Sequence, residues 1–141
     1  MKSIRNVYKI GKGPSSSHTM GPFKAVRHYL ESHEDTDHLH VTLYGSLAAT
    51  GKGHLTDWAC EDAFRDGTVA IVWKPKENLP MHPNGMQIGV IGSDGEVSDV
   101  WTYYSIGGGD IVCVESPIEE AGGEDVYELT TMKDILDWCN T

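Results

Sequence analysis

A short stretch near the start of the chain combines the side chains that are best suited to chemistry. Between the breakers Gly13-Pro14 and Gly21-Pro22 lie three serines, a histidine and a threonine: Ser15, Ser16, Ser17, His18 and Thr19. Hydroxyls, an imidazole and the unpartnered N–H groups at the start of a following helix all suit a bound anion. We therefore expect this loop to hold a carboxylate or phosphate. The alternative is that the loop is an ordinary helix cap.

Three further polar turns with glycines follow, at 45–54, 82–86 and 105–109. The first of them ends in His54. His18 and His54 each end a turn rich in small residues, where an imidazole can project toward a ligand, and histidine is the usual proton-transfer group near neutral pH. His38 and His40 have a spacing that could ligate zinc, but no third ligand is near. We find no phosphate-binding Walker loop and no G-x-S-x-G nucleophile turn.

The composition excludes several classes of protein. The chain of 141 residues has 21 acidic and 11 basic side chains, for a formal net charge of −10. This charge argues against a nucleic-acid surface and against binding to an anionic membrane. The three cysteines form neither a disulfide framework nor a CxxC metal site, so metal ligation is not expected and a reducing cytoplasm is. The length and the 39% of hydrophobic residues suit one domain, residues 1–141.

The elements that must position these turns follow from hydrophobic periodicity. We expect helices over about 21–32, 47–50, 55–64 and 132–139, and strands over 38–44, 68–73, 87–91, 97–104 and 110–115. The third helix should bury Leu55, Trp58, Ala59 and Ala63. The hairpins and single-helix connections predict an α+β fold, in which helices pack on a mixed, mostly antiparallel sheet.

The motifs together are more specific than any one of them. Gly13–Pro22, Leu43–Asp57, His82–Met86 and Tyr103–Gly109 occur in this order. In this respect the whole chain resembles the beta chain, or N-terminal beta domain, of the bacterial iron–sulfur L-serine dehydratases (L-serine ammonia-lyases). The resemblance implies a cytoplasmic lyase that converts L-serine to pyruvate and ammonia, in amino-acid catabolism and gluconeogenesis. It also implies a [4Fe-4S] cluster held by cysteines of an alpha chain or domain and not by this chain.

The same resemblance implies roles for the polar turns. His54 is the first choice for the catalytic base and His18 the second, as base or as carboxylate partner. The substrate-binding residues would be Ser15, Ser16, Ser17, His18, Thr19, Lys52, His82 and Asn84. The loop of hydroxyls would hold the substrate carboxylate while iron from outside this chain takes the hydroxyl group.

The expected partners are the alpha part of the same enzyme and L-serine. The sequence also allows a homodimer. Because the cluster lies elsewhere, we expect the isolated chain to be inactive, whether it is a separate subunit or a piece of a longer enzyme. Two alternatives stay open: a regulatory module that binds serine or another small anion, similar to a domain of some phosphoglycerate dehydrogenases, and a zinc hydrolase built on His18, His54 and His82.

Overall fold

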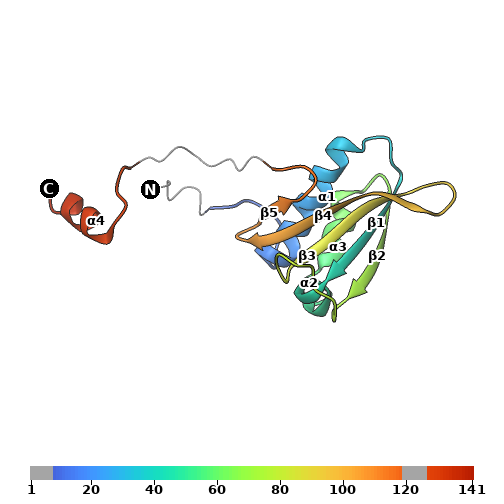
Figure 1. Ribbon diagram of the computed structural model, residues 1–141, viewed down its shortest axis with the longest axis horizontal. Coiled ribbons are helices and arrows are strands. Elements are labelled where there is room, and N and C mark those ends of the chain that lie inside the picture. The colour runs from blue at the N-terminus through green and yellow to red at the C-terminus, as the bar shows by residue number, and fades with distance from the viewer. Residues whose placement is uncertain (1–7, 119–126) are drawn as a thin grey trace. The chain divides into compact units, whose positions relative to one another are not determined.

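The computed structural model describes residues 8–118 and 127–141. These residues belong to two units, Gly11–Ile118 and a second one that combines Met1–Ile10 with Glu119–Thr141, and each unit is described by itself. The larger unit holds every strand and all but one of the helices of the described chain (Figure 1). The assignment of all 141 residues to a single domain therefore stays a prediction.

Five strands form the sheet of the larger unit, in the order β2-β1-β3-β4-β5. Their bounds are β1 His38–Tyr44, β2 Thr68–Lys74, β3 Gly85–Ile91, β4 Val97–Gly107 and β5 Asp110–Cys113. β1 pairs with β2 in parallel, whereas β1–β3, β3–β4 and β4–β5 are antiparallel. The predicted mixed, mostly antiparallel sheet is confirmed.

The parallel pair requires a crossover connection that returns the chain to the same end of the sheet, and two helices lie in this connection. They are α2, Gly45–Thr50, and α3, Thr56–Ala63. The segment before β1 contains a five-residue π-helix, η2 at Ser16–Met20, which runs directly into α1 at Gly21–Ser32. This arrangement of helices on a mixed sheet confirms the predicted α+β class.

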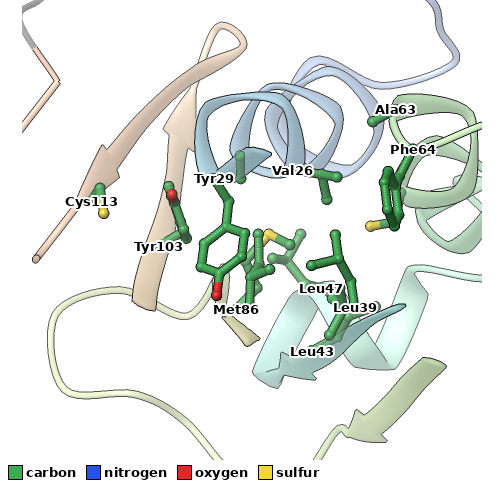
Figure 2. Packing of buried hydrophobic residues seen from close by; sticks show 14 of the residues in the cluster. Val26, Tyr29, Leu39, Leu43, Leu47, Ala63, Phe64, Met86, Tyr103 and Cys113 are labelled. Atoms are coloured by element: carbon green, nitrogen blue, oxygen red, sulfur yellow. The ribbon is translucent and has the colours of Figure 1, made fainter. Parts of the chain in front are cut away.

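The core lies between one face of the sheet and the helices (Figure 2). Alternate residues of β1, namely Leu39, Val41 and Leu43, are fully buried, as the period of two in the sequence predicts. Val26 and Tyr29 of α1 pack against them from the helix side, at the three-residue spacing expected of a buried helical stripe. The end of β1, where the chain turns into α2, is thereby fixed to a rigid scaffold.

One predicted core face is half right: Ala59 and Ala63 are buried as expected. Leu55 and Trp58 were expected to be buried, but they are 46% and 40% exposed. α3 begins only at Thr56, because Leu55 has a left-handed backbone with a φ of 57°. The helix is thereby turned so that its buried residues are Thr56, Ala59, Cys60 and Ala63.

β5 also differs from its prediction. The strand was expected to run through residue 115, but it ends at Cys113, and Val114 is 53% exposed. The helical turn or short extended piece expected over 3–9 and the loop expected over 116–125 lie largely outside the described residues.

In the second unit, the predicted C-terminal helix is present as α4, Met132–Cys139. Thr131 caps it, and Thr131 and Asp134 form a reciprocal capping box. Met132 and Leu136 on its apolar side are 69% and 56% exposed. Of the helices in the described ranges, none has the length and apolar character needed to cross a membrane.

We expect Leu43→Ala to lower the free energy of unfolding of the whole chain by about 2–5 kcal/mol, because Leu43 is fully buried where β1 pairs on both sides. Val72→Thr on β2 should change it by no more than about 0.5 kcal/mol, because Val72 is 39% exposed. Urea unfolding measures both values. Equal losses in the two variants would show that the core does not lie on the helix-covered face.

Candidate functional site

The serine-rich loop near the start of the chain forms a π-helix, Ser16–Met20, that is capped by Ser15. The Ser15 hydroxyl accepts a hydrogen bond from the His18 N–H at 3.1 Å, and the Ser15 carbonyl accepts from the N–H groups of Thr19 and Met20. Short π-helical turns are rare and are often found at functional sites. The capping role that we considered as an alternative is therefore real for the Ser15 hydroxyl, and the exposed Ser16 is free of it.

The structure brings His18 and His54 together. Their ring centroids lie 5.0 Å apart, with the ring planes tilted by 39°. Two buried threonines hold the segments that carry them: the Thr19 hydroxyl donates to the His54 carbonyl at 2.7 Å, and the Thr56 hydroxyl donates to the His18 carbonyl at 2.5 Å. Two turns whose bonded residues lie 35 and 38 positions apart in the sequence thus come together.

His18 has a protein partner at each ring nitrogen. Its Nδ1 lies 2.9 Å from the Ser17 hydroxyl, and its Nε2 lies 3.2 Å from both the carbonyl and the hydroxyl oxygen of Ser46. Burial lowers the pKa of His18 below its ordinary value of 6.5, the Ser46 carbonyl opposes this, and the neighbouring His54 lowers it further. The neutral imidazole is therefore favoured.

His54 has one engaged nitrogen and one that is available. Its Nδ1 lies 3.0 Å from the Thr50 carbonyl oxygen. A carbonyl only accepts hydrogen bonds, so Nδ1 carries the proton and Nε2 of the neutral ring carries the lone pair. Across 8–118 and 127–141, no hydrogen bond to this Nε2 is described. An oriented imidazole with a free lone pair can accept a proton from a bound molecule.

The turns at 82–86 and 105–109 join the same hydrogen-bond network. The Ser105 hydroxyl donates to the Ser17 carbonyl at 2.7 Å, and the Asn84 side chain donates to the Ser105 carbonyl at 3.3 Å. His82 accepts from the Asn84 N–H at 3.0 Å within its own turn, and the Ser46 N–H donates to the carbonyl of Pro83. All four polar turns of the sequence therefore meet at one end of the sheet.

Ser105 and Ser46 are residues that the sequence did not single out. Both lay within turns that we identified, but a serine hydroxyl that supports a loop has the same local signal as any serine in a turn. The sequence carries a partial signal of burial at Ser105, because this residue follows the aromatic pair Tyr103-Tyr104. In the structure Ser105 is 1% exposed. A buried serine normally has a hydrogen-bond partner, which here is the serine loop.

Two of the predicted binding residues are engaged elsewhere. Thr19 is 1% exposed, and its hydroxyl also accepts a hydrogen bond from the Ser15 N–H, so this buried side chain stabilises the loop itself. The Lys52 ammonium lies 5.6 Å from the centroid of the Trp73 ring, in cation–π geometry. Their roles toward a substrate stay predictions.

The described cysteines do not suit an iron–sulfur cluster, which is held by several thiolates. Cys60 and Cys113 are buried on different elements, and burial raises the pKa of the Cys60 thiol to about 12. Within the described ranges, no three histidines, cysteines or carboxylates gather in a way that could hold a metal ion. This includes the trio His18, His54 and His82 that a zinc hydrolase would need.

Comparison with known proteins identifies the family. A model of the serine dehydratase beta-chain family matches residues 3–66 and 61–116. L-serine dehydratase 1 of Escherichia coli K12 is 34% identical over 99% of this chain, and an L-serine dehydratase of Helicobacter pylori 26695 is 31% identical over 97%. An L-serine dehydratase of Mycobacterium bovis is 34% identical over 78%.

This chain belongs to the serine dehydratase beta-chain family. It spans 40% of the length of the Escherichia coli relative and 39% of the Helicobacter pylori relative. The resemblance inferred from the four turns is thereby confirmed at the level of the family.

The close approach of Gly21 to Ser105 gives a test of how the loop is anchored. A Cβ at Gly21 would clash with the Ser105 hydroxyl. We expect Gly21→Ala and Ser105→Ala each to destabilise the chain, by about 1–3 kcal/mol for Ser105→Ala because its hydroxyl is buried and bonded. In urea unfolding, Gly21→Ala should cost less in the Ser105→Ala background, because that background removes the hydroxyl contact and leaves only the contact with the Ser105 Cβ at 2.9 Å. Strict additivity of the two losses would contradict the contact.

The lowered pKa of His18 predicts a pH dependence of stability. Because the unfolded chain binds this proton more readily, the contribution of neutral His18 is complete above the ordinary value of 6.5 and is lost as pH falls through the folded-state pKa. We expect wild type to lose more unfolding free energy than His18→Gln between about pH 7 and about pH 5. Parallel losses, or an NMR titration midpoint for His18 above 6.5, would contradict the assignment.

Proposed function

We propose that this chain is the beta component of an iron–sulfur L-serine ammonia-lyase, which converts L-serine to pyruvate and ammonia. The observation that carries the proposal is the pair His18 and His54 at 5.0 Å, in which Nε2 of His54 is left as a free proton acceptor. Family membership and the printed names of the relatives support the reaction. The regulatory alternative would use the same site for binding without bond breaking.

Loss of water from serine requires a base for the Cα proton and groups that hold the carboxylate. In the proposal, Nε2 of His54 takes the proton, since the Thr50 carbonyl holds the ring in the required tautomer. The Ser15–Thr19 loop holds the carboxylate, chiefly through the exposed hydroxyl of Ser16. His18 is the second candidate for the base, and Lys52, His82 and Asn84 complete the substrate-binding set.

The cofactor and the partner lie outside this chain in the proposal. A [4Fe-4S] cluster on an alpha chain or domain would act as Lewis acid toward the departing hydroxyl. The relatives extend well beyond the region that this chain matches, which leaves room for such a part. Three exposed apolar side chains lie in or directly next to turns around the site and suit the contact, namely Leu55, Met81 and Ile106. A homodimer and a cytoplasmic location complete the proposal.

The test is His54→Asn in the enzyme assembled with its alpha part and reconstituted without oxygen. The asparagine amide can still donate to the Thr50 carbonyl, but it has no lone pair at the position of Nε2. We expect kcat for L-serine to fall by at least about a hundredfold while KM changes little. His38→Asn, the same replacement at an exposed histidine of β1, should leave both unchanged.

Three results would each contradict a part of the proposal. Wild-type kcat in His54→Asn would show that His54 is not the base. If His54→Asn kept the wild-type kcat but lost a regulatory response of the enzyme to added L-serine, this would instead support the regulatory alternative. Turnover of L-serine by the isolated chain would contradict the assignment of the cluster to a partner.

A further inference from the structure

The proton on His18 has a fixed position that follows from its neighbours. Nε2 lies 3.2 Å from the Ser46 carbonyl oxygen, which can only accept a hydrogen bond, and 3.2 Å from the Ser46 hydroxyl, whose oxygen can accept one as well, so a protonated Nε2 suits both oxygens. The Thr50 hydroxyl donates to the same carbonyl oxygen at 3.0 Å, and this oxygen has a second lone pair for the N–H of His18. The opposite tautomer would direct the lone pair of Nε2 at the lone pairs of the carbonyl. The neutral His18 ring therefore carries its proton on Nε2.

This tautomer determines what the Ser17 hydroxyl can do. Nδ1 of His18 is then a pure acceptor, and the Ser17 hydroxyl at 2.9 Å must donate its single proton to it. The Ser17 oxygen retains lone pairs and no proton for any other group. The lowered pKa of His18 supports the neutral ring on which this polarity depends.

We propose that Ser17 accepts a hydrogen bond from the α-ammonium group of the bound amino acid and does not donate to its carboxylate. A carboxylate needs donors, and the committed hydroxyl of Ser17 presents only lone pairs, whereas an ammonium group needs acceptors. No carboxylate side chain takes part in the hydrogen bonds described for Ser15–Thr19, so this loop meets the cation with neutral oxygen.

Ser16, the adjacent residue, has the opposite character. It is exposed, and among the described residues no hydrogen bond involves its hydroxyl, so its proton is free for a carboxylate. The two neighbouring serines thereby distinguish the two charged ends of a zwitterion. This refines the proposed function, on which the assignment of the ammonium rests, and it separates amino acids from hydroxy acids of the same length.

The first experiment tests the polarity alone, on the full chain without partner or substrate. Two-bond ¹H–¹⁵N NMR correlations of ¹⁵N-histidine-labelled chain at neutral pH report which nitrogen of His18 is protonated. We expect protonated Nε2 and unprotonated Nδ1, and a shift of the Nδ1 resonance in Ser17→Ala when its donor is lost. The reverse tautomer, or a charged ring, would overturn the proposal whether or not the enzyme dehydrates serine.

The second experiment tests the ligand group, in the assembled enzyme. Ethanolamine keeps the ammonium and hydroxyl groups of serine but lacks the carboxylate, and β-hydroxypropionate keeps the carboxylate but lacks the ammonium. We expect Ser17→Ala to weaken inhibition by ethanolamine, and to raise KM for L-serine, by about tenfold, with β-hydroxypropionate unaffected. Ser16→Ala should give the opposite pattern, and Ser17→Thr, which keeps the hydroxyl, should restore ethanolamine binding.

The outcomes separate this inference from the proposed function. Equal weakening of both inhibitors by Ser17→Ala, or weakening of β-hydroxypropionate alone, would overturn the ammonium assignment. An assembled wild-type enzyme that binds both inhibitors but does not turn over L-serine would remove the proposed reaction and leave the ammonium assignment intact. If Ser17→Ala does not fold, Ser17→Thr and the wild-type tautomer still decide the polarity of Ser17.

Discussion

The site depends on a reciprocal pair of hydrogen bonds between two buried threonines and two histidine carbonyls. Thr19, which follows His18, binds the carbonyl of His54, and Thr56, which lies two residues after His54, binds the carbonyl of His18. Thr19 and Thr56 are 1% and 0% exposed, so loss of either partner would leave a buried polar group without compensation. Each histidine is therefore positioned by the segment that carries the other.

The remaining features of the larger unit support this pair. β1 and α1 are anchored in the core, and they deliver the two segments to the same end of the sheet. Ser105, near the C-terminal end of β4, holds the serine loop through its hydrogen bond to Ser17. Leu55 adopts a left-handed backbone, and the chain thereby passes from His54 into α3 with Thr56 buried. The cost of that backbone conformation is tolerated where surrounding contacts determine it. The scaffold is apolar and regular, while the site is polar and irregular.

Much of the scaffold could be predicted from the sequence, and the reason is local. Alternation over 38–44 and helical spacing over 21–32 report burial directly, and both elements have the predicted bounds. The burial of Leu55 and Trp58 was predicted wrongly because periodicity assumes that the helix starts with its first apolar residue, whereas a left-handed Leu55 shifts the start and the buried face. The four turns could be found as turns, but their meeting depends on strand order, which local patterns do not contain. The proton positions on His18 and His54 depend on carbonyl groups, which every residue has and no sequence pattern marks.

The π-helical turn makes the number of serines before His18 matter as much as their chemistry. The Met20 N–H reaches back five residues to the Ser15 carbonyl, and the Gly21 N–H reaches back five to Ser16. This turn accommodates one residue more than the corresponding α-helical turn. Deleting one serine would close an ordinary α-turn and rotate everything before it by about 100° relative to α1. The run of three serines therefore also acts as a spacer of defined length between the start of the loop and α1.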